Sequence, residues 1–145
     1  MTAKEYLKQV EKIDLMIKNK LIEREQALAL ALSVTSHLTP DKVQSSSSQQ
    51  KMAEAVERYV SLETEIDNCI DELFDTKKEI ISKIEKLEAR YYDILHKVYI
   101  QYLEYKDIAK QCDRSYSWVS MMHDKALQQF EEMFISEIVK SCEKL

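Results

Sequence analysis

The stretch YKDIAKQCDRSYSWVSMMHDKAL, residues 105–127, holds two apolar helical patterns separated by a short polar turn. Ile108 and Ala109 mark the inner face of the first predicted helix, and the small side chain of Ala109 lets a second helix cross closely. Residues 113–114 form the predicted turn, since Asp is a common turn residue. Ser115 is a good N-cap because its hydroxyl can accept a hydrogen bond from an amide of the first turn. The stretch therefore predicts a helix-turn-helix.

The second predicted helix has one apolar side and one polar side. Val119, Met122 and Ala126 recur at spacings of three and four residues, so we expect them to face the first helix. In helix-turn-helix proteins the opposite side of this helix meets the major groove of DNA. The residues on or near that outward side are Tyr116, Ser117, Ser120, Met121 and Asp124.

The composition favours helices throughout the chain. Its 145 residues include no glycine and one proline, Pro40. Hairpin turns and bulges favour glycine, so its absence argues against a β-sheet. A chain that is 45% hydrophobic and 32% charged, with Lys, Glu, Leu and Ile at helical spacing, is typical of helical proteins with coiled-coil character. We predict an all-α fold.

The amino-terminal part predicts one long amphipathic helix over residues 2–36. Thr2 followed by Glu5 fits a capping box at its start. Residues 27–34, ALALALSV, are apolar nearly all round, so we expect the rest of the chain or a second copy to cover them on more than one side. The predicted apolar stripe consists of Val10, Ile13, Ile17, Leu21, Leu28 and Ala31.

Residues 37–50, HLTPDKVQSSSSQQ, interrupt the helical pattern. Helix is disfavoured at Thr39 because a proline follows it, and the run of serines has nothing to bury. We predict a mobile, solvated connector. A phosphorylation or docking segment is the less favoured interpretation.

A second long helix is predicted from about residue 51 to about residue 87, with a heptad pattern. Two such helices joined by a loop would lie antiparallel, each about 50 Å long. Further apolar residues (Val60, Leu62, Cys69, Phe74, Ile81) widen the face, which suggests a bundle, a dimer or packing on the rest of the chain. The predicted seam consists of Met52, Val56, Tyr59, Glu63, Ile66, Ile70, Leu73, Lys77, Ile80, Ile84 and Leu87.

Residues 88–102, EARYYDILHKVYIQY, predict another helix, with Tyr91, Ile94, Leu95, Val98 and Tyr99 on its inner face. We expect its tyrosines and Tyr105 to fill core positions while their hydroxyls reach water, although stacking on bases is an alternative use. The final helix continues past residue 127. The apolar stripe of this helix consists of Phe130, Phe134, Ile138 and Cys142. We expect it to dock on the long hairpin or on another subunit.

These patterns divide the chain into three parts. We predict a coiled-coil-like antiparallel helical hairpin over residues 1–87 and a helix-turn-helix domain over residues 88–134. Residues 135–145 form a helical tail.

The spacing of cysteines and histidines gives no sign of a metal site or a disulfide. Cys69, Cys112 and Cys142 are far apart and each falls on an apolar helical position, so we expect buried free thiols. A Gly-rich phosphate loop, paired Cys and His, and a Ser-His-Asp set are all missing, so we expect no enzyme, no cofactor and no small-molecule substrate. No segment approaches the roughly 20 apolar residues that span a bilayer, so we expect no membrane partner and a reducing cytoplasm.

The net charge of −5 argues against a generic polyanion binder. Residues 90–129 carry six basic and five acidic side chains, so this region is mixed and not basic. Non-specific DNA affinity comes mainly from phosphate neutralisation. A lone copy should therefore bind DNA weakly at physiological salt.

Residues 87–127 resemble region 4 of sigma factors, with no insertion or deletion along the stretch. Matching features include Tyr-x-x-Ile-Ala at residues 105–109 and the step from Ser115 to Val119. Upstream, VQSSSSQQKMAEAVERYVSLETEID (residues 43–67) is similar to a family of small phage and prophage proteins of Gram-positive bacteria, which are associated with RinA and ArpU type late-transcription regulators. Further matching positions are Leu87, Arg90, Ile94, Leu95, Tyr99, Ala126 and Leu127.

The resemblance implies sequence-specific binding of double-stranded DNA that activates a phage late or packaging operon in the cytoplasm of a bacterial host. RNA polymerase is a further candidate partner. A homodimer would bind a palindromic or repeated half-site. The DNA-binding residues that it implies are Arg114, Ser115 and Lys125 near the backbone, Tyr116, Ser117, Ser120 and Met121 at the bases, and Trp118 and Asp124 beside them.

A protein-interaction module is the alternative function. It would keep the sigma-like shape but dock on RNA polymerase or another phage protein without reading DNA. The near-neutral recognition helix favours this alternative. Trp118 has two interpretations: it packs partly on the first helix, or it is an exposed anchor for a protein partner, which would favour the alternative. A purely structural coiled-coil adaptor does not explain the spacing in residues 105–127.

Overall fold

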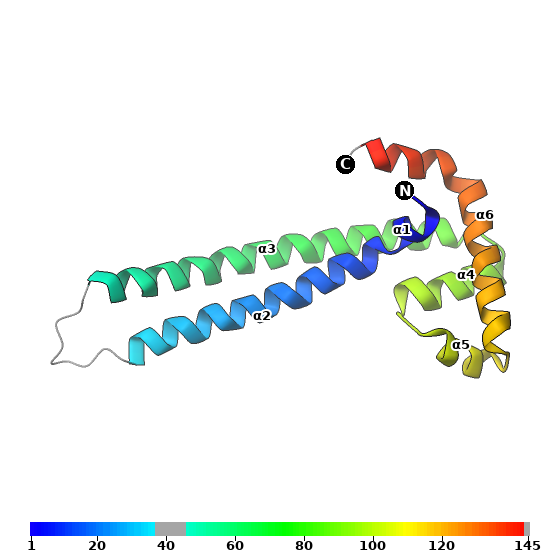
Figure 1. The fold of residues 1–145 in the computed structure, drawn as a ribbon. Coiled ribbons are helices and arrows are strands. Elements are labelled where there is room, and N and C mark those ends of the chain that lie inside the picture. The colour runs from blue at the N-terminus through cyan, green and yellow to red at the C-terminus, as the bar shows by residue number, and fades with distance from the viewer. Residues whose placement is uncertain (37–45, 144–145) are drawn as a thin grey trace. The chain divides into compact units, whose positions relative to one another are not determined.

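The computed structural model describes residues 1–36 and 46–143, and each element in these ranges is helical, which confirms the all-α prediction. Contacts group the chain into two compact units. The terminal unit comprises Met1–Ile13 and Leu73–Leu145, and the helix-pair unit comprises Asp14–Glu72. The elements are α1 (Ala3–Leu7), α2 (Gln9–Ser36), α3 (Ser46–Ile84), α4 (Ala89–Leu95), the π-helix η1 (His96–Ile100), α5 (Tyr105–Cys112) and α6 (Tyr116–Glu143), and Figure 1 labels the α-helices.

The first helix begins with the predicted capping box. The Thr2 hydroxyl accepts a hydrogen bond from the Glu5 amide at 3.2 Å, and the Glu5 carboxylate accepts one from the Thr2 amide at 2.7 Å. The single helix predicted over residues 2–36 is divided at Lys8, which separates α1 from α2. Lys8 has ψ −7°, far from the value of an α-helix, so the chain turns there.

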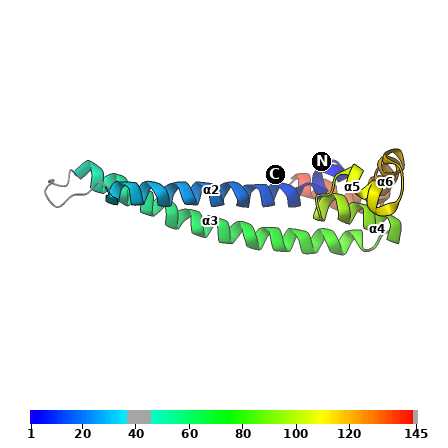
Figure 2. The ribbon, with the colours of Figure 1, turned by 90° about the horizontal axis from the view of Figure 1, so that it is seen from below.

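In the helix-pair unit, α2 and α3 run side by side in opposite directions (Figure 2). Ile17, Ala31 and Ile66 are buried between them as predicted. Leu28 is exposed, so its predicted place in the stripe is wrong, and Ala27 is buried in its place. The seam of this unit is narrow and partly built from alanines: the buried residues are Ile17, Ala27, Ala31, Ala55, Leu62, Ile66 and Cys69.

The buried seam of α3 differs from the predicted one at every second position, where the buried residue is the one just before the predicted residue. Val56, Glu63 and Ile70 were expected inside, but all are exposed. The residues one position earlier are buried instead, namely Ala55, Leu62 and Cys69. The observed seam thereby places Leu62 inside and leaves the carboxylate of Glu63 in water, which avoids the cost of burying a charge.

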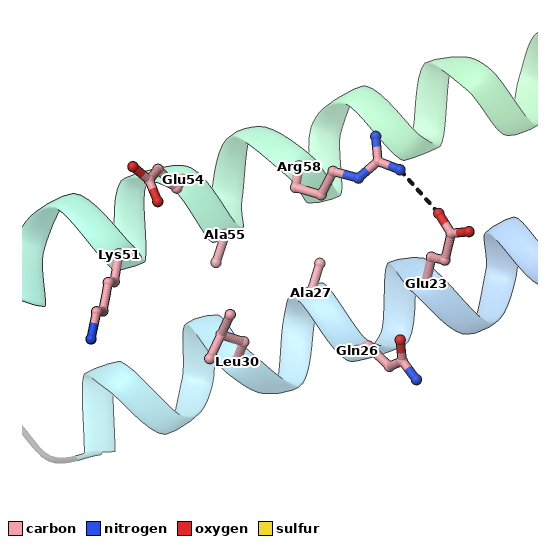
Figure 3. Close-up of a pocket in the computed structure, with 8 residues that line it drawn as sticks. All are labelled: Glu23, Gln26, Ala27, Leu30, Lys51, Glu54, Ala55 and Arg58. Atoms are coloured by element: carbon pink, nitrogen blue, oxygen red, sulfur yellow. Dashed lines mark hydrogen bonds and ion pairs between the residues drawn. The ribbon is translucent and has the colours of Figure 1, made fainter.

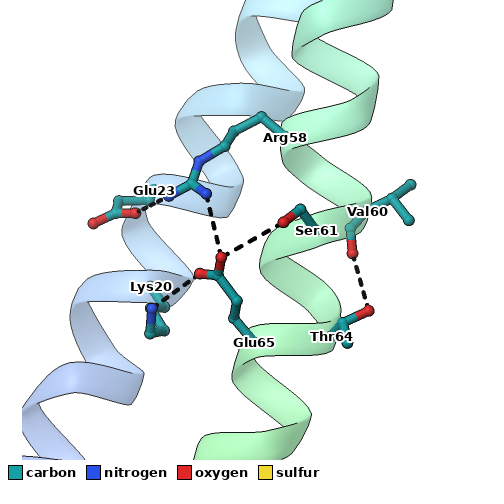
Figure 4. A network of polar contacts seen from close by, with 7 residues as sticks. All are labelled: Lys20, Glu23, Arg58, Val60, Ser61, Thr64 and Glu65. Carbon is teal, nitrogen blue, oxygen red and sulfur yellow. Dashed lines mark hydrogen bonds and ion pairs between the residues drawn. The ribbon is translucent and has the colours of Figure 1, made fainter.

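Ion pairs along one side of this unit fix how the two helices are aligned (Figure 4). Lys20 pairs with Glu65 at 3.0 Å, and Arg58 bridges Glu23 at 3.0 Å and Glu65 at 3.4 Å. The Ser61 hydroxyl also donates to Glu65 at 3.5 Å. Water reaches most of these side chains and screens their charges, so each pair adds little to the stability of the fold. Their value lies in specifying the alignment.

The long core of the terminal unit runs along one side of α6. Phe130, Phe134 and Ile138 are buried, as the predicted stripe requires. The centroid of the Phe130 ring lies 5.9 Å from that of the Tyr6 ring, so the final helix packs on α1. The predicted fourth member, Cys142, lies outside the described side chains.

Lys83 joins three helices of the terminal unit. Its ammonium group donates to the Tyr6 hydroxyl at 2.5 Å and pairs with Glu79 at 2.9 Å and Glu137 at 2.8 Å. Burial acts to lower the pKa of Lys83, but the bonds to Glu137, Tyr6 and Glu79 outweigh it and hold the pKa above its usual range. Lys83 therefore stays charged and links α1, α3 and α6.

Two further boundaries differ from the prediction. Residues 46–50 belong to α3 and not to the connector, whose other residues, 37–45, lie outside the described part of the chain. The helix predicted over residues 88–102 ends as the π-helix η1 at Ile100. Tyr102 follows in a left-handed conformation with φ 58°, a sharp turn that the helical pattern does not indicate.

Candidate functional site

The turn between α5 and α6 is closed by backbone hydrogen bonds. Asp113 adopts a left-handed conformation, with φ 52° and ψ 48°. The next amide, that of Arg114, donates to the carbonyl of Ala109 at 2.9 Å, which ends α5 in the manner of a Schellman motif. Asp visits this conformation more readily than most residues other than glycine, so a chain without glycine can still make the turn.

Ser115 then starts the second helix. Its hydroxyl accepts a hydrogen bond from the amide of Trp118 at 3.1 Å, which is the geometry of an N-cap. The helix α6 begins at the following residue, Tyr116. The turn and the cap thus lie where the sequence predicts them.

The inner sides of α5 and α6 form one apolar contact. Ile108, Val119 and Ala126 are almost fully buried, and Ala109 and Met122 are buried beside them. The small side chain of Ala109 allows the two backbones to approach, as expected from the sequence. This contact leaves one side of α6 available to solvent.

The outward side of α6 carries a shallow groove. Tyr116 is 61% exposed and Met121 is 43% exposed. Six of the predicted site residues line the groove, so the fold brings them together as expected. Gln128 was missed by sequence reasoning, although its position four residues after Asp124 places it on the same helix face. The lining residues are Tyr116, Ser117, Ser120, Met121, Asp124, Lys125 and Gln128.

The other predicted site residues lie beside the groove and do not line it. Ser115 uses its hydroxyl as the helix cap. Trp118 is half-buried, and the guanidinium of Arg114 lies over its ring at 5.2 Å. A cation over an indole ring is attracted by the negative face of the ring. This stacking holds Arg114 at the turn, at the edge of the exposed surface.

The charge of this region is mixed. Lys125 and Asp124 bring opposite charges to the groove. On α5, Lys106 pairs with Glu104 at 3.2 Å. The surface therefore offers polar and apolar groups in a defined pattern rather than a strong positive field.

His123 supports the groove from below. It is 2% exposed, and its ring is held between two tyrosines. The Tyr99 hydroxyl lies 2.8 Å from Nε2, and the Tyr105 hydroxyl lies 2.7 Å from Nδ1. The prediction that the Tyr99 hydroxyl reaches water is therefore wrong, because a buried imidazole supplies its partner, whereas Tyr105 is only half-buried.

Burial sets the ionisation state of this cluster. It lowers the pKa of His123, while the nearby carboxylate of Asp124 opposes the shift and Lys4 adds to it. Burial also raises the pKa of Tyr99 and of Tyr105, so both phenols stay neutral. A neutral imidazole fits this site because it has one donor and one acceptor nitrogen for the two hydroxyls.

In residues 1–36 and 46–143, His, Cys, Asp and Glu side chains do not gather in groups of three or more that could hold a metal ion. None of the helices described combines the length and the apolar character needed to cross a bilayer. Cys69 is a buried free thiol, and Cys112 is a half-buried one.

Comparison with protein-family models, with curated proteins and with solved structures finds no significant match to this chain.

Proposed function

We propose that this chain is a sequence-specific DNA-binding regulator of phage or prophage transcription, of the late-gene activator type. In this proposal α5, the turn at Asp113 and α6 form a sigma region 4-like helix-turn-helix, and α6 is the recognition helix. The terminal unit positions this element, and a homodimer acts on the DNA in the bacterial cytoplasm. Double-stranded DNA is the principal partner and RNA polymerase a second one.

One observation carries the proposal. The first turns of α6 are buried on one side against α5, through Val119 and Met122, and open to solvent on the other. A recognition helix needs this division, because its outward residues must enter a groove about 12 Å wide while its inward residues hold it on the fold. The exposed Tyr116 and Met121 lie on the open side.

The chemistry of the groove suits base edges. Ser117 and Ser120 offer hydroxyls that can donate or accept, and the Asp124 carboxylate can accept from the amino group of cytosine. The apolar parts of Tyr116 and Met121 can contact the methyl group of thymine. Arg114 and Lys125 lie where they can contact phosphates.

Mobility-shift experiments with DNA from the neighbourhood of the gene test this function. Met121→Glu places a negative charge on the proposed DNA surface and should abolish a sequence-specific shift, because the charge repels phosphates. Met133→Glu is the matched control: Met133 lies on the same helix with 48% exposure but outside the groove. The proposal fails if both variants shift the DNA as the wild type does.

A protein-docking role is the second candidate. The mixed charge of the groove and the exposed Tyr116 favour it, because aromatic residues anchor protein interfaces. In that case RNA polymerase subunits or another phage protein would be retained by the immobilised chain while DNA is not. Tyr116→Ala would then abolish retention and leave the helicity unchanged.

A further inference from the structure

We propose that the helix-pair unit packs through one of its faces against the same face of a second copy of this chain, so that two pairs form a four-helix bundle. The inference uses residues Asp14–Glu72 alone. It does not depend on DNA binding and goes beyond the proposed function, because it assigns the surface and the arrangement of the dimer.

Two flanks of α3 lie on either side of its buried seam. Positions 51, 54, 58, 61 and 65 follow one another at spacings of three and four, and so do positions 56, 60, 63, 67 and 70. The seam positions 55, 62 and 69 lie between these two rows, so the rows belong to opposite faces of the helix pair.

The first flank belongs to a charged face. Arg58 and Glu65 of this flank make the ion pairs with Glu23 and Lys20 of α2 (Figure 4). Further along, a pocket between the helices has charged side chains at its rim and an apolar lining formed by Ala27, Leu30 and Ala55 (Figure 3). It is lined by Glu23, Gln26, Ala27, Leu30, Lys51, Glu54, Ala55 and Arg58. We call this side the ion-pair face.

The second flank belongs to an apolar face. Arg24 pairs with Glu63 at 4.0 Å, which shows that these positions of α2 and α3 share that side of the unit. The same side of α2 carries positions 21, 25, 28 and 32. Five large apolar side chains are exposed there. The apolar face is defined by Leu28, Leu32, Val56, Val60 and Ile70.

The helix pair alone leaves this apolar surface in water. The seam between the two helices contains Ala27, Ala31 and Ala55, which bury little area, and two of them also line the pocket on the ion-pair face. In the row on α3, Val56 and Val60 lie one helical turn apart, and Ile70 follows beyond the acidic Glu63 and Asp67. Together with Leu28 and Leu32 of α2, these side chains gather on one side of the pair, and a cluster of exposed apolar residues indicates an interaction site where a scattered one does not.

The size of the face fits a second copy. The apolar face covers about 18 residues along the pair, or about 27 Å at 1.5 Å per residue, and two helices side by side are about 20 Å wide. Such a footprint is roughly 540 Å² on each copy, so two copies bury about 1,100 Å², just above the roughly 1,000 Å² that a biological interface needs. Because each copy presents the same face, a two-fold axis closes the assembly.

Charges select one arrangement. The α3 side of the apolar face carries the acidic Glu63 and Asp67, and α3 on α3 would bring the acids of two copies together. The ion pairs align Lys18 of α2 roughly with Asp67 of α3 along the pair. With α2 on the α3 of the other copy, Lys18, which also pairs with Asp14 of its own helix at 3.5 Å, therefore faces Asp67 of the partner subunit.

The mass of the full chain in solution is the first test. By sedimentation equilibrium the wild type should have twice the chain mass of 17.1 kDa. Val56→Glu puts a charge in the apolar face and should weaken dimerisation at least about a hundredfold. Ile22→Glu is the control, because Ile22 is exposed on the side of α2 opposite the seam. Circular dichroism should show equal helicity in all three proteins. A monomeric wild type, or equal dimerisation by both variants, would overturn the proposal.

A mixing experiment tests the arrangement. Lys18→Glu and Asp67→Lys each create two like-charge contacts in a homodimer, so each variant alone should dimerise about tenfold more weakly. When mixed, they should form a heterodimer with near wild-type affinity, because both contacts become opposite in sign. Each chain carries only one of the two substitutions, so a new ion pair within a single chain cannot account for the restored affinity of the heterodimer. Absence of heterodimer preference in the mixture would contradict the α2-on-α3 arrangement.

Discussion

The Tyr105 hydroxyl lies 2.7 Å from Nδ1 of His123, a buried residue of the same helix that carries the groove. The Tyr99 hydroxyl holds the other ring nitrogen at 2.8 Å. Since a neutral imidazole has one donor and one acceptor, one tyrosine donates to the ring and the other accepts from it. His123 therefore fixes α6 against η1 and α5, directly beneath the residues proposed to read DNA.

This arrangement predicts an acid-sensitive fold. Burial keeps the pKa of folded His123 below the 6.5 of an unfolded chain. The charge of Lys4 adds to this shift and that of Asp124 opposes it, while the neutral Tyr99 and Tyr105 contact the ring. Below pH 6.5 the unfolded state binds a proton that the folded state does not, so the free energy of unfolding falls as pH decreases towards the folded pKa. The slope due to His123 is at most about 1.4 kcal/mol per pH unit.

Urea unfolding between pH 5 and 7.5 measures this dependence, with His123→Gln as the comparison that removes one titrating group. The variant is expected to be less stable at pH 7.5 but to lose less stability on acidification. Parallel pH curves for the two proteins would show that His123 does not titrate differently on folding.

The two tyrosines should differ in their contribution to stability. Tyr99→Phe leaves a ring nitrogen of His123 unpaired in the core and should cost about 1–3 kcal/mol. Tyr105 is half-buried, so water can partly replace its hydroxyl, and Tyr105→Phe should cost less. Chemical denaturation at neutral pH gives both values. A larger loss for Tyr105→Phe would contradict the assigned burial of the two hydroxyls.

The left-handed Asp113 predicts an unusual order of substitutions. Asp113→Val should lower the free energy of unfolding by about 1–2 kcal/mol, because a β-branched residue is strained at φ 52°. Asp113→Gly should be nearly neutral, since glycine adopts this conformation without strain. Thermal unfolding compares the two variants, and Arg114→Ala serves as the neighbouring control. An equally stable Val variant would mean that the turn does not require a positive φ.

The seam of α3 gives a direct comparison of adjacent positions. Leu62→Ala removes a fully buried side chain and should cost about 2–5 kcal/mol. Glu63→Ala changes an exposed residue and should alter stability by no more than about 0.5 kcal/mol. Chemical denaturation of both variants decides between the observed seam and one shifted by a single residue, for which the order would be reversed.

Local patterns predicted much of the structure because each depends on neighbouring residues alone. The capping box at Thr2, the turn at Asp113, the cap at Ser115 and the buried stripe through Phe130 all follow from side-chain chemistry at fixed spacing. The outward residues of α6 followed from the same periodicity. Gln128 was missed because the outward face was followed for only three turns.

Features that depend on distant contacts could not be predicted in this way. Apolar residues at both position 55–56 and position 69–70 make two heptad registers nearly equivalent, and the partner helix decides between them through Leu62. The bonds of Tyr99 and Tyr105 to His123 join residues that are 24 and 18 positions apart. The π-helix and the left-handed Tyr102 have no marker in the local sequence.

The salt dependence of DNA affinity tests the proposed phosphate contacts. With Arg114 and Lys125 as the contacts of each copy, the logarithm of the affinity should fall with the logarithm of salt concentration with a slope of about −2 per copy. Lys125→Gln should reduce this slope by about one per copy and weaken binding to all sequences alike. Fluorescence anisotropy at several salt concentrations measures both effects, and an unchanged slope would exclude Lys125 from the DNA contact.

Selection of binding sites from a pool of random double-stranded DNA by the full chain tests the central proposal most directly. The geometry of α5 and α6 predicts that one motif is enriched, with a repeated or palindromic half-site, and that Met121→Glu abolishes enrichment while Met133→Glu retains it. A folded wild-type protein that enriches no motif at low salt would contradict DNA reading by α6.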